Sequence, residues 1–156
     1  MNIGLDNKTR TTIVGMLNLI LADEYVLYFK ARKFHWNVSG PLFDMLHNGI
    51  FKNIYERLEE TTDEVAERIR ALGGYPLSTM TEFVQHARLK EAPGVDAMDA
   101  RNMVFELLND YETLIRIMRE NDKNISGMGD SVTSGYIQTL ILQHEKTAWM
   151  LRSSVK

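Results

Sequence analysis

Four residues in the first half of the chain have the types and spacing of metal ligands. His35 and His47 stand on either side of a Gly-Pro turn, and Asp63 and Glu67 follow one helical turn apart from each other. Imidazole nitrogen is a good ligand for iron, and carboxylate oxygen suits both Fe(II) and Fe(III). Six acidic residues lie between Glu56 and Glu67 against a single arginine, so this stretch would attract cations. The pattern predicts iron binding.

The second histidine and the acidic pair lie on different faces of the predicted helix. At about 100° per residue, His47 falls on the same helical stripe as Phe43 and Ile50, whereas Asp63 and Glu67 fall nearly opposite. The sixteen residues between His47 and Asp63 also correspond to a rise of about 24 Å. One subunit therefore cannot bring both pairs to one metal, and each pair is predicted to be a half-site that another subunit completes.

The elements that must position these residues are long helices. Apolar residues recur at i, i+3, i+4 and i+7 and predict helices over about residues 6–38, 41–72, 96–125 and from 130 or 131 onward. Thr79 and Glu82 form a capping box inside the connection 74–95, which predicts a short helix through about Leu89. The fold class is therefore all-α, a four-helix bundle in one domain (1–156), with a long crossover between the second and third helices.

Composition narrows the class of protein. The chain has 156 residues, no cysteine and a formal net charge of −3, which excludes disulfides and thiolate sites and disfavours nucleic acid as a general partner. The first residues lack the order of a signal peptide, and the apolar run 19–22 is too short to span a membrane. We expect a cytoplasmic protein with no membrane partner.

A metal site inside the bundle is not expected. The internal di-iron site of such bundles uses Glu-x-x-His motifs, and none of the four histidines has Glu three residues before it. His144 is interpreted as a hydrogen-bonded core residue, and His86 as a surface residue of the crossover. An alternative stays open for the acidic pair, which could be an ordinary solvated helix face with i, i+4 pairs such as Glu64–Arg68.

Three stretches resemble the Dps family of ferritin-like mini-ferritins. They are HWNVSGPLFDMLH from His35, DEVAERIRALGG from Asp63 and HEKTAWMLRS from His144, in that order along nearly the whole chain. The resemblance implies a hollow shell of twelve subunits that oxidises Fe(II), usually with hydrogen peroxide, and stores ferric mineral. It implies ferroxidase sites at two-fold interfaces, with His35 and His47 from one subunit and Asp63 and Glu67 from its neighbour.

The chain departs from that family at one ligand position. The family normally has a carboxylate one turn after the second histidine, where this chain has Phe51 with Lys52 beside it. The interval from His47 to the acidic pair is also one residue longer, and Gly49 is predicted to mark a one-residue bulge. Without this carboxylate the site would have one firm iron position or a lower affinity for iron. Lys52 would repel Fe(II) if it pointed inward. Asp44 is a candidate substitute.

The alternatives are a structural or DNA-associating shell with a degenerate metal site, and a monomeric helical bundle that binds other proteins. Strong DNA binding is not expected, because the only basic residues near the ends are Lys8, Arg10 and those in 152–156. Asp122 and Asp130 are candidates for an iron entry pore, with turn and helix-cap roles as the alternative. Trp36 is a candidate for electron transfer, with packing as the favoured role.

Overall fold

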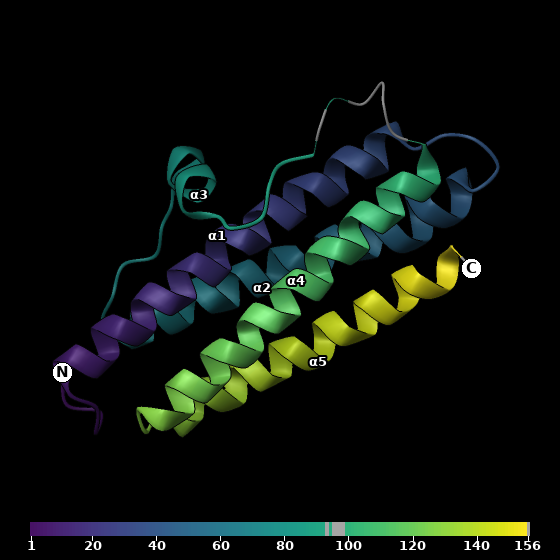
Figure 1. The fold of residues 1–156 in the computed structure, drawn as a ribbon. Coiled ribbons are helices and arrows are strands. Elements are labelled where there is room, and N and C mark those ends of the chain that lie inside the picture. The colour runs from purple at the N-terminus through teal and green to yellow at the C-terminus, as the bar shows by residue number, and fades with distance from the viewer. Residues whose placement is uncertain (93, 95–98, 156) are drawn as a thin grey trace.

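Four long helices lie side by side in a bundle, and a short fifth helix lies outside it against the first (Figure 1). The structure is a computed structural model, and it describes residues 1–92, 94 and 99–155. The elements are α1 (Asn7–Asn37), a π-helix η1 (Met45–Phe51) that leads into α2 (Lys52–Ala71), the short α3 (Met80–His86), α4 (Ala100–Gly127) and α5 (Ser131–Ser154). The predicted all-α bundle with a helix inside a long crossover is confirmed.

The bundle is held by one continuous apolar core. Residues such as Leu17 and Ile20 of α1, Leu114 of α4 and Leu140 of α5 have no exposed surface. Removing this apolar surface from water is the main driving force for the fold. Helix α1 is long and apolar enough to cross a membrane by composition, but half of its most apolar window is buried inside the bundle, as in the core helix of a soluble protein.

The start of the second helix differs from the prediction. Pro41 lies in a turn, the chain becomes helical at Phe43, and Met45–Phe51 is π-helical before α2 begins. Leu46 and Phe51 are five residues apart and are both fully buried. A π-helix places residues i and i+5 on one side, whereas an α-helix would turn them apart. The bulge predicted near Gly49 is confirmed as this π-helical turn.

Helix α3 ends at His86, three residues earlier than predicted. The backbone N–H groups of Arg88 and Leu89 donate to the Asp23 carboxylate at 2.6 and 3.0 Å instead of continuing the helix. Asp23 is fully buried and also pairs with the Arg88 guanidinium at 2.7 Å. The predicted start of the third helix near residue 96 lies outside the described residues, and Asp99 caps α4 by accepting from the N–H of Asn102.

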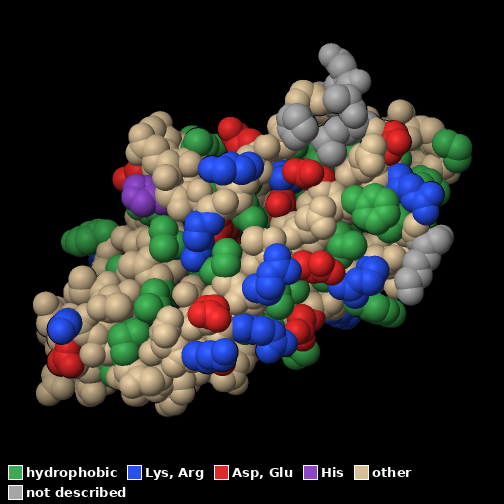
Figure 2. Space-filling model, viewed as in Figure 1, with side chains coloured by type: hydrophobic (Ala, Val, Ile, Leu, Met, Phe, Trp, Pro, Cys, Tyr) green, Lys and Arg blue, Asp and Glu red, His purple; other side chains and the backbone are tan. Residues whose placement is uncertain are grey.

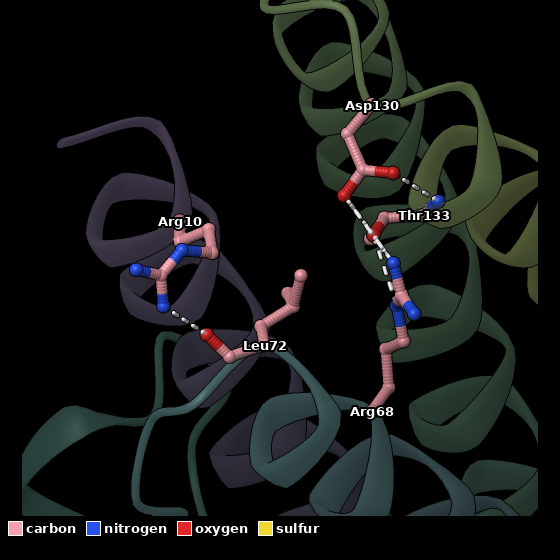
Figure 3. A network of polar contacts seen from close by, with 5 residues as sticks. All are labelled: Arg10, Arg68, Leu72, Asp130 and Thr133. Carbon is pink, nitrogen blue, oxygen red and sulfur yellow. Dashed lines mark hydrogen bonds and ion pairs between the residues drawn. The ribbon is translucent and has the colours of Figure 1, made fainter. Parts of the chain in front are cut away.

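Two arginines tie helix ends together (Figure 3). The Nη2 of Arg68 on α2 donates to Thr133 Oγ1 at 2.7 Å and lies 3.4 Å from Asp130, while Asp130 caps α5 by accepting from the Thr133 N–H. Arg10 donates to the Leu72 carbonyl at the end of α2. Arg68 thus has a structural role between two helices, and the pairing with Glu64 that the sequence favours is not the one that holds it.

Candidate functional site

The two histidines of the predicted half-site lie against each other at one edge of the bundle. Their rings are stacked, with centroids 3.7 Å apart and planes within 18°. His35 Nδ1 lies 2.8 Å from the backbone carbonyl oxygen of His47, and His47 Nδ1 lies 2.7 Å from the carbonyl oxygen of His35. The end of α1 and the π-helical turn therefore fix both rings through reciprocal contacts.

These contacts settle which ring nitrogen can bind a metal. A carbonyl oxygen only accepts hydrogen bonds, so each Nδ1 must carry a proton and donate it. A neutral imidazole protonated at Nδ1 has its lone pair at Nε2. Histidine ligands of metals commonly donate their other ring N–H to a backbone carbonyl, which fixes the tautomer and the ring orientation. Both rings are half-buried, and their Nδ1 contacts leave the two Nε2 lone pairs free of backbone partners.

Neighbouring aromatic residues hold the pair in place. The helical periodicity indicated Phe43 beside His47, whereas no sequence pattern indicated Tyr55. Phe43 stacks on His47 with centroids 4.8 Å apart, and the edge of Tyr55 meets His35 at 5.2 Å. The Arg32 guanidinium lies 4.7 Å from the Tyr55 ring centre. Trp36, for which packing was the favoured role, is 65% exposed, with Arg32 near its ring. Only the register between α1 and α2 brings these side chains together.

The acidic pair, Asp63 with Glu67, lies farther along the chain, on α2. Asp63 and Glu67 are both exposed, and Asp63 lines a surface groove with Tyr25, Tyr28 and Glu59. Over the described residues, no three metal-ligating side chains gather closely enough to hold an ion. The acidic pair and the histidine pair thus remain apart within one chain, as the helical wheel predicts.

The π-helical turn changes which residue lies one turn after His47, where the family normally has a carboxylate. Phe51 is fully buried and packs near Phe34, with ring centroids 6.0 Å apart, so it does not face the histidines. Because a π-helical turn spans five residues, Lys52 is the residue one turn after His47. Its ammonium lies 3.7 Å from Glu56. The candidate substitute, Asp44, accepts a hydrogen bond from Asn48 at 2.7 Å.

The remaining candidates have local roles in this chain. Asp130 is the N-cap of α5, and Asp122 accepts hydrogen bonds from Ser134 and Gln138 across the turn between α4 and α5. A pore role for either residue remains a prediction. His86 is exposed, as expected, and its Nδ1 contacts the carbonyl of residue 82 at 2.9 Å.

His144 is buried, as predicted, and its polar partner is the side chain of an acid on another helix. Its Nε2 lies 3.3 Å from an oxygen of Glu24, which is itself fully buried on α1. In the sequence, Glu24 shares the i, i+3, i+4, i+7 spacing of the apolar residues of α1, but this spacing gives no indication of a partner. A buried acid at an apolar stripe position was the available signal, because such a group needs a counterpart.

Comparison with known proteins extends these observations. The ferritin family, described as a ferritin-like domain, matches residues 14–156. The chain is 43% identical to an uncharacterised low temperature-induced protein of Nostoc sp., over all of this chain and 87% of that protein. It is 35% identical to DNA protection during starvation protein 2 of Bacillus anthracis, over 90% of this chain and 94% of that one.

Solved structures agree with the sequence comparison. A Dps protein from Vibrio cholerae O1, described as a member of a broad superfamily of ferritin-like diiron-carboxylate proteins, superposes with a TM-score of 0.93 at 31% identity, covering 100% of this chain and 97% of that one. A Dps protein from Bacillus brevis superposes with a TM-score of 0.91 at 30% identity, covering 97% and 100%.

Proposed function

Because the chain belongs to the Dps family of ferritin-like proteins, we propose that it oxidises Fe(II) at sites shared between two subunits and stores the ferric product in a hollow shell. The observation that carries this proposal is the reciprocal fixing of His35 and His47 by each other's backbone carbonyls. That arrangement leaves two Nε2 lone pairs for iron. A cytoplasmic shell of twelve subunits is the assembly we propose.

In this proposal iron is the substrate, and each half-site has a distinct task. His35 and His47 bind Fe(II) as neutral ligands, and Asp63 and Glu67 of the two-fold partner supply the negative charge that the ferric product prefers. With hydrogen peroxide as oxidant, one peroxide takes one electron from each of two Fe(II) ions and leaves as two hydroxides. The exposure of Asp63 and Glu67 supports the proposal, because only an exposed pair can reach a neighbouring subunit.

The enzyme activity is tested by adding Fe(II) and peroxide and following ferric absorbance. We compare the wild type with His47→Ala/Asp63→Ala, which removes a ligand from each half-site. The proposal requires faster oxidation by the wild type. Equal rates would leave a shell with a degenerate metal site as the function.

Sharing between subunits is tested by mixing two inactive variants. His47→Ala subunits are co-assembled with Asp63→Ala/Glu67→Ala subunits, and mixed shells are purified on two tags. A two-fold interface between unlike subunits contains one wholly wild-type site and one doubly defective site, so random mixing should restore about a quarter of wild-type activity. Activity no higher than in either parent would contradict shared sites, and a single-subunit mass on sizing would contradict the shell.

Association with DNA is a second candidate function, which relatives named for DNA protection bring into consideration. Basic side chains near the ends are largely engaged: Arg10 donates to Leu72, and Arg152 pairs with Glu112. Figure 2 shows Lys and Arg interleaved with Asp and Glu on the α4–α5 face, where Arg119 also pairs with Glu145. We propose that any DNA binding is weak and salt-dependent. A gel shift at low salt that persists at physiological salt would contradict this.

A further inference from the structure

A line of three tyrosines leads away from the histidine pair, between α1 and α2. It begins at Tyr55 of α2, whose ring meets His35 edge-on with centroids 5.2 Å apart. The Tyr55 ring meets that of Tyr28 on α1 at 6.4 Å between centroids. Tyr28 in turn meets Tyr25, three residues earlier on the same helix, at 6.4 Å. Neighbouring aromatic rings therefore connect His35 to Tyr25 without a gap.

The far end of this tyrosine line reaches the groove of the acidic pair. Tyr25 and Tyr28 line the same surface groove as Asp63. Tyr28 is buried, and Tyr25 and Tyr55 are half-buried, so most of the line is shielded from water. In the proposed function, Asp63 completes the iron site of the two-fold partner. Because a two-fold interface contains two such sites, each chain's tyrosine line connects one site with the other.

The guanidinium of Arg32 fixes the middle of the tyrosine line. Its Nη1 donates to the Tyr28 hydroxyl at 2.5 Å, and its central carbon lies 4.7 Å from the ring centre of Tyr55 and 5.3 Å from that of Tyr28. A cation over an aromatic face is attracted by the electrons of the ring. Because a guanidinium only donates hydrogen bonds, Tyr28 keeps its own hydroxyl proton available. The two rings are thus held in place while their hydroxyl groups can still lose and regain a proton.

The proposed reaction needs two electrons for each peroxide, whereas one Fe(II) supplies one. Two imidazoles and two carboxylates at a shared site are enough ligands for one iron ion. Lys52 lies one π-helical turn after His47, where the family normally has a further carboxylate for a second ion. We propose, building on the proposed function, that Tyr55, Tyr28 and Tyr25 carry the second electron from the iron at the other site of the same two-fold interface.

The transfer balances in two steps. In the first, Fe(II) gives peroxide one electron, and Tyr55 gives it a second electron together with the hydroxyl proton. This step yields Fe(III), one hydroxide, one water and a tyrosyl radical. In the second, Fe(II) at the other site reduces that radical through Tyr25 and Tyr28, and water returns the proton and becomes hydroxide. The sum is one peroxide and two Fe(II) converted to two hydroxides and two Fe(III), with the tyrosines unchanged and no hydroxyl radical released.

The test breaks the line at its middle. Shells loaded with one Fe(II) per site receive limiting peroxide, and the wild type should form two Fe(III) per peroxide. Tyr28→Phe keeps the ring but removes the hydroxyl group, so the radical should remain on Tyr55. We expect one Fe(III) per peroxide in this variant, with a tyrosyl radical signal by electron paramagnetic resonance after rapid freezing. Tyr28→Phe/Tyr55→Phe should lack that signal and release hydroxyl radical to a spin trap.

Matched controls separate the relay from packing. Tyr111→Phe changes a buried tyrosine whose ring meets His144, and it should behave as the wild type does. Binding of Co²⁺ at the edge should be equal in all variants, and Tyr25→Phe breaks the far end of the line if Tyr28→Phe assembles poorly.

The outcomes distinguish the relay from the proposed function on which it rests. Two Fe(III) per peroxide in Tyr28→Phe and Tyr25→Phe, or one in the wild type, would overturn the relay and leave iron oxidation standing. No faster oxidation by the wild type than by His47→Ala/Asp63→Ala would overturn the proposed function and the relay with it.

Discussion

The edge pair, His35 with His47, and the interior pair, Glu24 with His144, hold their polar side chains in place in opposite ways. In the edge pair both Nδ1 atoms are satisfied by backbone carbonyls, and the rings are half-buried. In the interior pair the Glu24 carboxylate and the His144 imidazole are both buried, and Glu24 Oε1 lies 3.3 Å from His144 Nε2. One pair is oriented by the backbone, and the other is enclosed by the core.

The difference has an energetic consequence. A half-buried imidazole with its Nδ1 bonded loses little when its Nε2 faces water, so the edge pair is stable with or without a metal. A buried unpaired polar group costs about 1–3 kcal/mol each. Breaking the interior pair is therefore expected to lower the stability of the fold, whereas breaking the edge pair is expected to affect activity.

The largest expected effect comes from breaking the interior pair. At pH 7, His144→Leu should lower the free energy of unfolding by about 3 kcal/mol, because it leaves the Glu24 carboxylate buried without a counterpart. The double variant Glu24→Leu/His144→Leu should recover most of this loss. Urea unfolding at a fixed protein concentration measures both, and equal destabilisation in the two variants would contradict the prediction.

The same variant should respond to pH. Burial raises the pKa of the Glu24 carboxyl above its value in the unfolded chain, so the folded state binds the proton more tightly. The free energy of unfolding of His144→Leu should therefore be highest in acid and fall as the pH rises through the raised pKa. The double variant lacks this carboxyl and serves as the control.

Removing one histidine of the edge pair should weaken metal binding strongly and lower the stability of the fold only slightly. We expect His35→Ala to weaken metal binding at the edge by about 10–100-fold, because one Nε2 and the ring stacked on His47 are both lost. The free energy of unfolding should change by less than about 1 kcal/mol, because the ring is half-buried. Binding of Co²⁺ and urea unfolding measure the two, and His86→Ala is the matched control.

A smaller effect is expected from the charge beside the edge pair. Lys52→Glu places a carboxylate one π-helical turn after His47 and should raise the affinity for Fe(II) several-fold, because a repelling charge becomes an attracting one. Lys123→Glu makes the same change of charge on α4 and should leave the affinity unchanged. An equal gain in both variants would show that only the net charge matters.

The smallest effect tests whether packing also fixes the edge pair. Phe43→Ala removes the ring stacked on His47, a contact worth about 0.5–1.5 kcal/mol, and should weaken metal binding about two- to five-fold. Phe105→Ala removes an equally exposed ring from α4 and is the control. A loss as large as that of His35→Ala would mean that stacking, and not the carbonyl contacts, orients the ring.

Much of the fold could be predicted because its signals are local. The i, i+3, i+4, i+7 periodicity depends on neighbours along one helix, and it located four long helices and placed Asp63 and Glu67 on an exposed face. The capping box of Thr79 and Glu82 marked the start of α3 correctly for the same reason. The resemblance to the Dps-family pattern showed one extra residue between His47 and Asp63 and hence indicated a bulge near Gly49.

Tertiary structure decided what depends on contacts between distant residues. Only packing shows that Phe51 belongs to the core and that Lys52 lies one π-helical turn after His47, because a π-helical turn changes which residues share a face. Only packing brings Glu24 of the first helix to His144 of the last. The sequence by itself determined which residues could bind metals, and the register between helices determined which of them meet, because no periodic pattern in one helix specifies its neighbour's side chains.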